Sequence, residues 1–332
     1  MAFCGNNHAL PFMRMNVGAK AEGLGGAFTA LADDGSAIYW NPARTIFNRE
    51  KHLQGNYSHL SLDRSFNVLA YSHKFEIKDF ALGAMFINSG TSGIEGYSLD
   101  NQKQGTFTAS DNVLLVSGSY AVNQFFSFGG NIKFLMNKVE NQTDSGFGVD
   151  LATFYRPIEE VKIGLVAHDI YTKVGKESGI GRLPWNVKMG IAVQEIFEEL
   201  TFASDLTKVE GNSKIGYAFG VEWKFWDKTS DLEIAFRSGV NTISFDNLGF
   251  SAGVGFKKNS FGFDYAFVSN QESVFGQSHI ISTSYAIGET YEYVSRRMKY
   301  EERMNKTLEE IRQQRMIEEK KLEELKKELK KK

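Results

Sequence analysis

Most of the chain alternates between large apolar residues and small or polar residues. The clearest stretch runs from Lys214 to Phe225, where a strand would carry on one face only Ile215, Tyr217, Phe219, Val221, Trp223 and Phe225. Its other face would carry Lys214, Gly216, Ala218, Gly220, Glu222 and Lys224. Because successive side chains of a strand point to opposite faces, this period of two predicts a β-strand with one apolar face.

The same alternation recurs from Lys51 to Glu289 and predicts about fourteen strands. We place them at 51–61, 64–75, 78–89, 111–122, 125–139, 145–156, 160–170, 185–195, 199–208, 213–226, 230–240, 246–258, 259–269 and 277–288. Most are as long as the roughly 9 to 11 residues that a strand needs to cross a bilayer. An even number of strands is typical of bacterial single-chain barrels.

Glycine is frequent on the face opposite the apolar one, as at Gly129, Gly148 and Gly253. The inner face of a barrel is crowded by curvature, so small residues alternate there with polar ones. The polar face of a soluble sandwich usually carries Thr, Lys, Glu or Ser instead. We therefore expect an all-β, transmembrane antiparallel barrel, with a soluble β-sandwich as the alternative.

The links and the aromatic residues extend this prediction. The long links are Gly90–Ser110, Tyr171–Pro184 and the neighbourhood of Phe245, and we expect these to be outer loops. Aromatic residues gather near the segment ends, as in the girdles at membrane surfaces. They are Tyr71, Tyr97, Tyr155, Tyr171, Trp185, Trp223, Trp226, Tyr265 and Tyr285.

Several charged or polar residues fall on the face predicted to line the lumen. They are Asp150, His168, Lys188, Asp205, Glu222, Lys224, Glu233, Arg237 and Asp264. A charged group in a barrel interior must be paired or hydrated, so these residues predict a ladder of ion pairs between neighbouring strands. Contact with a transported substrate is the alternative role.

The two ends of the chain differ from the middle. Residues 1–48 include a glycine-rich stretch at Val17–Arg44, and residues 290–332 are rich in Glu, Lys, Arg and Leu without Gly or Pro. We expect three parts: an N-terminal hatch or plug (1–48), the barrel (49–289) and a charged α-helix (290–332).

Composition supports many strands joined by tight turns: 32 Gly, 27 Phe, 13 Tyr and only 4 Pro among 332 residues. The formal net charge of −2 gives no field that would recruit nucleic acid. The single cysteine, Cys4, excludes a disulfide within the chain. Residues 1–9 are compatible with the tail of a secretory signal.

Residues for catalysis or metal binding are not arranged in a known pattern. The six histidines show no metal-ligand spacing, so we expect no metal and no cofactor. Gly249-Phe-Ser251-Ala-Gly253 has the spacing of a nucleophile elbow, but it falls inside a predicted strand and not at a strand-to-helix turn. We therefore predict that the protein is not an enzyme.

The stretch GAKAEGLGGAFTALADDGSAIYWNPA resembles the N-terminal signature of the PorV/PorQ family, within the wider FadL-like group of outer-membrane barrels. The shared pattern is Gly25, Gly26, Ala32, Asp33, Asp34, Ser36, Ala37, Tyr39, Asn41, Pro42 and Ala43. The resemblance implies a barrel of fourteen strands whose N-terminal residues fold into the lumen as a hatch. Over the rest of 15–288 it extends only to the strand pattern.

Physical properties of the stretch agree with a hatch. Gly23, Gly25 and Gly26 allow close contact of the backbone with a barrel wall. Asp33 and Asp34 can cap backbone amides or pair with lumen Lys and Arg. Asn41 and Pro42 turn the chain toward the first strand.

Two functions are open at this point. FadL-type members imply uptake of long-chain fatty acids or other small hydrophobic molecules past the hatch, in contact with outer-membrane lipid. PorV-type members imply a non-transporting component of a secretion machine of type IX or of another envelope complex. With an even number of strands both barrel ends lie in the periplasm, where residues 292–332 would bind a partner protein.

The C-terminal segment predicts a helix whose apolar residues follow three-and-four spacing for most of its length. The seam slips in the middle, where Arg315 and Glu318 occupy it and Met316 and Ile317 lie beside it. A coiled coil is therefore insecure. Glu302 before Lys306, Glu323 before Lys327 and Glu328 before Lys332 favour a solvated single helix equally well.

Overall fold

A computed structural model describes residues 13, 15–48, 51–60, 64–75, 79–98, 100–140, 142–175, 181–196, 199–227, 232–243, 247–269, 277–287, 309, 311–317 and 321. Two compact units divide the chain, Met1–Gly288 and Glu289–Lys332. In the second unit, residues 311–317 are helical and exposed. Most of the predicted helix, the question of a coiled coil, and Cys4 lie outside the described residues.

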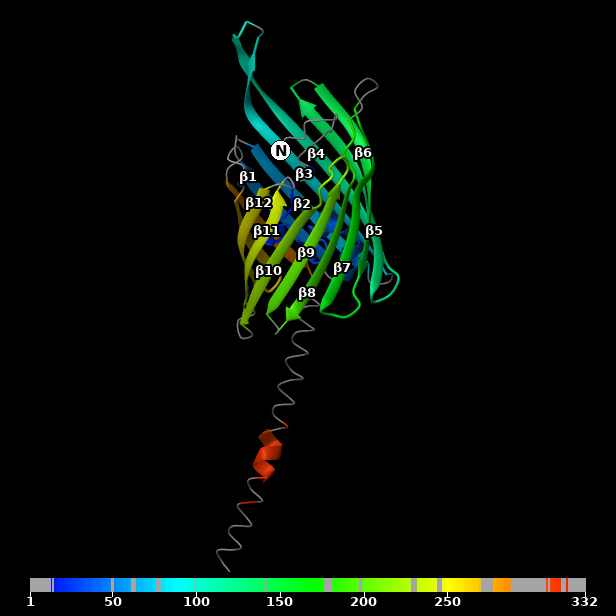
Figure 1. Ribbon diagram of the computed structural model, residues 1–332, viewed down its shortest axis with the longest axis vertical. Coiled ribbons are helices and arrows are strands. Elements are labelled where there is room, and N and C mark those ends of the chain that lie inside the picture. The colour runs from blue at the N-terminus through cyan, green and yellow to red at the C-terminus, as the bar shows by residue number, and fades with distance from the viewer. Residues whose placement is uncertain are drawn as a thin grey trace, which may run out of the picture. The chain divides into compact units, whose positions relative to one another are not determined.

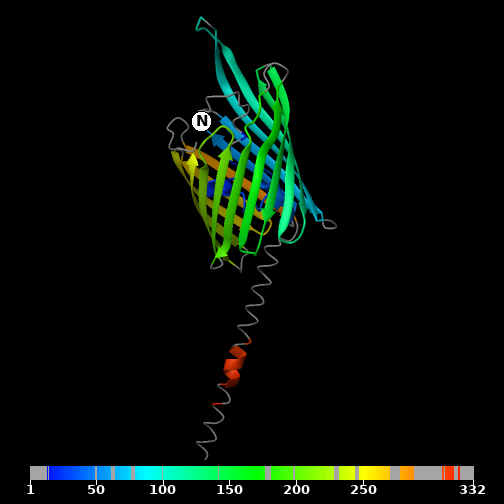
Figure 2. The ribbon, with the colours of Figure 1, turned by 45° about the vertical axis from the view of Figure 1, so that its right-hand side comes forward.

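The first unit is a closed barrel of fourteen antiparallel strands, as predicted (Figures 1 and 2). Each strand pairs with its neighbours in sequence, and β1 pairs with β14. The strands are β1 (Lys51–Leu60), β2 (Arg64–Phe75), β3 (Phe80–Tyr97), β4 (Lys103–Ala121), β5 (Phe126–Val139), β6 (Gln142–Tyr155), β7 (Val161–Val174), β8 (Asn186–Ile196), β9 (Leu200–Val209), β10 (Gly216–Asp227), β11 (Leu232–Ile243), β12 (Asn247–Lys258), β13 (Phe261–Ser269) and β14 (Gln277–Ile287).

The predicted loop Gly90–Ser110 is wrong, because most of it is strand. β3 continues to Tyr97, beyond its last residue that pairs with β2. β4 begins at Lys103, before its first residue that pairs with β5. This two-stranded ribbon rises above the rest of the barrel in Figure 1. Its residues are mostly Gly, Ser, Thr and Gln, because a strand outside the membrane needs no apolar face. β7 likewise runs to Val174, so the predicted loop from Tyr171 begins too early.

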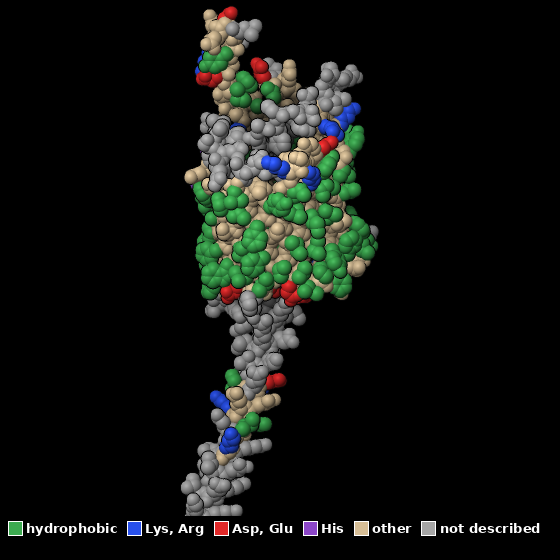
Figure 3. Space-filling model, in the orientation of Figure 1, with side chains coloured by type: hydrophobic (Ala, Val, Ile, Leu, Met, Phe, Trp, Pro, Cys, Tyr) green, Lys and Arg blue, Asp and Glu red, His purple; other side chains and the backbone are tan. Residues whose placement is uncertain are grey.

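Apolar side chains cover the outside of the wall in a broad band (Figure 3). They come from strands all around the barrel and are 41–57% exposed: Leu69, Phe86, Leu114, Phe134, Leu151, Met189, Phe219 and Phe250. Tyr71, Tyr155, Tyr171, Trp223 and Tyr285 are exposed as well. A continuous apolar band on a closed barrel is the surface that meets lipid tails, so the strands span a membrane. No helix among the described residues is long and apolar enough to cross a membrane.

Residues 15–48, which we call the lumenal segment, lie inside the barrel. They form α1 (Ala19–Gly23), α2 (Ala37–Trp40) and the 3-10 helix η2 (Pro42–Phe47). The segment receives or donates hydrogen bonds on opposite sides of the wall, from Asn131 on β5 to Ser282 on β14. Nearly every residue from Val17 to Ile46 is buried or half-buried as a result.

Five inward-facing glycines let the lumenal segment lie directly on the wall. A Cβ atom added at any of them would lie 3.0 Å or less from the backbone of the segment. We call them the glycine belt: Gly129, Gly164, Gly190, Gly220 and Gly239. At Gly239 the added atom would collide with the backbone of Leu24 and Gly25. Here contact between two backbones, and not strand flexibility, requires glycine.

Gly239→Val should displace the lumenal segment while the barrel remains closed, because the wall is held by its own ladder of hydrogen bonds. Limited proteolysis of the folded protein in detergent should then cut within 15–48 much faster than in the wild type. Gly55→Val is the matched control, since a Cβ atom there would meet only Thr283 Oγ1, at 3.6 Å. Unchanged protection in Gly239→Val would contradict the docking.

Candidate functional site

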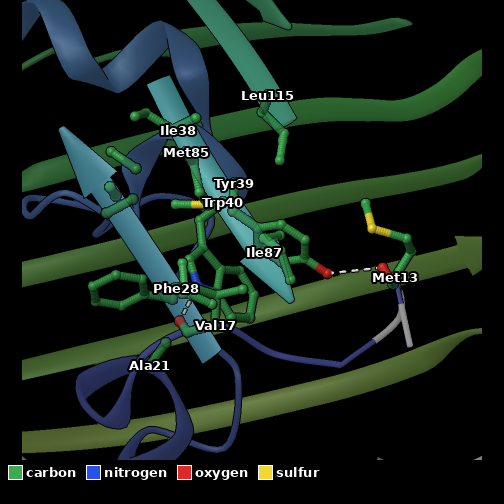
Figure 4. Packing of buried hydrophobic residues seen from close by; sticks show 14 of the residues in the cluster. Met13, Val17, Ala21, Phe28, Ile38, Tyr39, Trp40, Met85, Ile87 and Leu115 are labelled. Atoms are coloured by element: carbon green, nitrogen blue, oxygen red, sulfur yellow. Dashed lines mark hydrogen bonds between the residues drawn. The ribbon is translucent and has the colours of Figure 1, made fainter. Parts of the chain in front are cut away.

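α2 and the turns beside it form the apolar centre of the lumen (Figure 4). Phe28, Ile38 and Trp40 are completely buried and belong to one apolar cluster with wall residues of β3 and β4. Trp40 Nε1 donates to Val17 O (2.8 Å), and the Tyr39 hydroxyl donates to Met15 O (2.9 Å). These bonds pair the polar atoms of two large aromatic side chains in an otherwise apolar environment.

The wall under this cluster is apolar on its inner face. On β2 to β4 these apolar residues are Phe66, Val68, Met85, Ile87, Val113 and Leu115, and β5 adds only Leu135, each at most 4% exposed. The interior of a membrane barrel is usually polar. One side of this lumen therefore offers an apolar surface to whatever lies against it.

The side formed by β10 to β13 carries charge instead. Arg237 Nε donates to Glu222 Oε2 and its Nη1 donates to Asp264 Oδ1, both at 2.6 Å. Lys224 lies 3.6 Å from Glu222 and 3.7 Å from Glu233. The structure thus brings five of the predicted lumen residues together as an ion-pair network across neighbouring strands. A guanidinium between two carboxylates holds this wall rigidly, because removal of either partner leaves a buried charge.

A second network links β5, β6 and β7. Asp150 accepts a hydrogen bond from Asn131 and forms an ion pair with Lys133 (2.8 Å), which also pairs with Asp169 (2.7 Å). His168 lies beside Asp150. Asp150 and His168 are among the lumen residues predicted from the sequence, whereas Lys133 and Asp169 are not. Lys133 was visible on the inward face, whereas nothing in the period-two pattern placed Asp169 there.

Asp205 and Lys188 contact the lumenal segment itself. Asp205 Oδ2 accepts hydrogen bonds from the backbone N–H groups of Phe28 (3.2 Å) and Thr29 (3.0 Å). The Lys188 ammonium lies 4.3 Å from the centroid of the Trp40 ring, in cation–π geometry. Both residues therefore fix the segment to β8 and β9.

Within the lumenal segment, the predicted residues hold its own turns. Asp33 pairs with Lys20 of the same segment (2.7 Å), although pairing with wall Lys or Arg was one expectation. Asp34 Oδ1 accepts hydrogen bonds from Ser36 N (2.8 Å) and Oγ (2.5 Å). Asn41 Oδ1 accepts from Ala43 N at the start of η2.

Asn41 also ties the segment to the wall. Its Nδ2 donates to Thr29 O (3.1 Å) and to Thr153 O of β6 (3.2 Å). Pro42 follows at the first position of η2, where the missing N–H costs nothing. Gly25 and Gly26 have φ of 68° and 82° and end the turn after α1, and Gly23 lies against Gly253 of β12.

Burial of the lumenal segment shifts the pKa values of two of its charged side chains, Asp34 and Lys20. Burial and the neighbouring Asp33 raise the pKa of Asp34 from its ordinary value to about 6, against the opposing effects of Lys20 and Ser36. Burial, the largest effect, would lower the pKa of Lys20, but the carboxylates of Asp33 and Glu222 together outweigh it and the pKa is raised. Lys20 therefore stays protonated at neutral pH, while Asp34 changes charge just below it.

The described residues show no arrangement for catalysis by a metal. They contain no group of three or more His, Cys, Asp or Glu side chains placed to hold a metal ion. Ser251, of the G-x-S-x-G stretch, lies within β12 and its hydroxyl donates to Gly23 O and Gly239 O (3.4 Å each). It is one more contact between the wall and the lumenal segment.

A closed wall, an apolar outer band and an N-terminal segment inside the lumen define a transmembrane β-barrel with a lumenal plug. Solved structures with this fold include proteins named as a monoaromatic hydrocarbon channel, a toluene transporter and a FadL homologue. No protein-family model and no curated protein matches the sequence.

Three solved structures illustrate the likeness. The CymD monoaromatic hydrocarbon channel has a TM-score of 0.61 and 13% identity over 83% of this chain and 98% of its own. The Pseudomonas putida toluene transporter TodX has a TM-score of 0.58 and 11% identity over 85% and 99%. A Pseudomonas aeruginosa FadL homologue has a TM-score of 0.55 and 12% identity over 82% and 98%.

The likeness supports the predicted FadL-like group at the level of the fold. None of the three structures is a PorV or PorQ protein, so the narrower resemblance stays a prediction.

Asp34→Asn should make the protein more stable at neutral pH. A carboxyl whose pKa is raised in the folded state stabilises that state below its ordinary pKa, near 4, and loses this contribution as the pH rises through about 6. The amide keeps an acceptor for Ser36 without the charge. We expect a gain of about 1–2 kcal/mol in the free energy of unfolding at pH 8 and none at pH 4. Urea unfolding in detergent at both pH values measures it, and equal effects would contradict the assignment.

Proposed function

We propose that this protein is a FadL-like barrel of the bacterial outer membrane that takes up small hydrophobic molecules, with the lumenal segment as its gate. The observation that carries the proposal is the apolar inner wall of β2 to β4. An interior that served only water or ions would be polar. The CymD and TodX structures, named as a hydrocarbon channel and a toluene transporter, agree with a cargo of this kind.

α2 covers the apolar wall, and this makes it the gate. Ile38 packs so closely on β3 that a Cβ atom added at Gly83 would lie 2.7 Å from its Cδ1. While α2 stays in place, the wall is shielded, and displacement of α2 would open an apolar strip along β2 to β4. A hydrophobic ligand that replaces these contacts would offset much of the cost of moving α2, because apolar surface stays out of water.

The orientation follows from the topology. β1 begins and β14 ends at the same end of the barrel, opposite the β3–β4 ribbon. We assign that end to the periplasm and the ribbon to the outside, as in single-chain barrels with an even number of strands. Long-chain fatty acids and monoaromatic compounds are the cargo classes to test first.

Val113→Asn should slow uptake, because it places an unpaired amide on the apolar wall, which costs about 1–3 kcal/mol. We expect at least a roughly fivefold lower initial rate for radiolabelled oleate and toluene, in a Gram-negative host that lacks a channel of this type. Ser58→Asn is the control, since Ser58 is equally inward and buried but lies on β1 outside the apolar wall. Equal uptake in wild type and empty host would end the proposal, once assembly in the outer membrane is verified.

A second candidate is the PorV-type role, in which the barrel anchors a secretion or envelope complex. The close fit of the lumenal segment on the glycine belt favours it, because such a lumen is filled by its own chain. The described helical residues also expose three apolar side chains, Ile311 (44%), Met316 (58%) and Ile317 (55%). These would form part of a contact with a periplasmic protein.

Replacing Ile311, Met316 and Ile317 together by glutamate tests this role, because exposed apolar residues in a helix gain little unless a partner covers them. The variant should lose any envelope protein that copurifies with the wild type after crosslinking, while the barrel still assembles in the outer membrane. Glu309→Gln is the control for a change of charge on the same helix. A wild type that copurifies with no protein would contradict the adaptor role.

A further inference from the structure

The wall of the barrel forks at the point where β7 leaves β8. β7 pairs with β8 only from Val161 to His168, and the last opposed residues are His168 and Asn186. β7 continues for six more residues, and between it and the chain leading into β8 the described residues form one bridge, Val174 to Gly181. On the inner face of the wall, His168 and Asn186 lie buried at this fork.

A bulge at the fork turns two consecutive side chains inward. Opposite β6, the register jumps between Val149 and Leu151, so that three residues of β7 face Asp150 alone. The middle one, Asp169, has φ of 55°, which is uncommon for a residue with a side chain. His168 and Asp169 are 4% and 3% exposed as a result. Such bulges re-aim side chains, and this one crowds polar groups into the lumen.

Asp150 lies at the centre of the polar residues on the inner face of the fork. Its Oδ1 accepts a hydrogen bond from Asp169 N (2.8 Å) and lies 2.8 Å from Lys133 Nζ. Its Oδ2 accepts from Asn131 Nδ2 (3.0 Å) and lies 3.6 Å from His168 Nδ1. The carboxylate thus sets the orientation of the two side chains on either side of it.

Three hydrogen-bond acceptors at the fork are left without a partner in the part of the chain that the structure describes: Asn131 Oδ1, His168 Nε2 and Asn186 Oδ1. Asn131 donates both amide hydrogens, to Ile38 O and Asp150 Oδ2, so its oxygen cannot be exchanged for its nitrogen. The His168 proton belongs on Nδ1, next to Asp150, which leaves Nε2 as an acceptor. All three residues are at most 4% exposed.

Aromatic and aliphatic side chains lie beside this polar group. The Tyr39 ring stacks on His168, with centroids 5.7 Å apart. Leu135, Val174 and Leu183 belong to the same apolar cluster as Tyr39. Buried acceptors without donors are costly in such a place, and a native structure keeps them where a ligand or water supplies the missing hydrogens.

We infer that the fork binds the hydroxyl group of an otherwise apolar ligand, such as a phenol or an alcohol, which donates its hydrogen to His168 Nε2 or Asn186 Oδ1. A carboxylate brings only acceptors to a site that already has unpaired ones. A cation is not favoured, because the charges of Lys133, Lys188, Asp150 and Asp169 cancel. The inference rests on the proposed uptake of hydrophobic molecules and narrows its substrate class.

Phenol, toluene and anisole test the site, because their rings match and only phenol can donate a hydrogen bond. Calorimetric titration of the detergent-purified full chain should show phenol binding roughly tenfold more tightly than toluene, the effect of one hydrogen bond to a buried acceptor. Anisole should bind like toluene. Because the three ligands are compared on the wild-type protein, this test does not depend on the folding of a variant.

Of the variants Asn186→Leu and His168→Phe, the one that removes the acceptor used by the hydroxyl should bring phenol binding down toward that of toluene, and both should leave toluene binding unchanged. Asn56→Leu, on β1 and similarly buried, is the matched control and should keep the preference for phenol. Equal binding of phenol and toluene by the wild type would overturn the inference while the proposed uptake stands, and so would a preference that survives in both variants. Failure to bind any of the three ligands would remove the proposed uptake and this inference together.

Discussion

Contact between two backbones governs this structure. The lumenal segment lies on the inner wall so closely that the glycine belt has no room for a methyl group. Every other arrangement inside the barrel depends on that fit. The segment places Trp40 and Ile38 on the apolar wall, and it brings the N–H groups of Phe28 and Thr29 to Asp205. Glycine on the inner face is thus required by the segment as well as by curvature.

The lumen has two unlike halves. The wall from β2 to β4 is apolar, whereas β10 to β13 carry the network of Arg237, Glu222 and Asp264. The ion pairs keep the charged wall fixed, because separating a buried pair is strongly unfavourable. The contacts of Ile38 and Trp40 with the apolar wall are non-directional, so another apolar molecule can replace them. The half that can change its contacts is therefore the half suited to a hydrophobic ligand.

The fold was largely predictable because the lipid imposes a strict period of two on each strand. All fourteen predicted segments overlap a strand, and the residues from Ile215 to Phe225 show why: their outer face must be apolar. The prediction failed where that constraint ends. The ribbon around Glu95 and Lys103 has polar residues on both faces, so hydrophobic periodicity could not reveal it.

The candidate sites were predictable only in part. Inward charges such as Asp150 and Arg237 follow from alternation, but their partners depend on register across strands. Asp169 reaches the lumen only through the bulge in β7, and the pairing of Asp33 with Lys20 depends on the turn between them. The alternation of residues along one strand predicts neither the bulge in β7 nor the pairing of Asp33 with Lys20.

The hydrogen bond from Ala19 N to Ser282 Oγ joins residues 263 positions apart. The lumenal segment, which is synthesised before the strands, therefore finds this partner only when the last strand is present. β1 and β14 close the wall around the segment. Contacts between residues so far apart in the sequence imply slow folding. A chain cut before β14 would lack both its seam and one of the bonds that hold its interior.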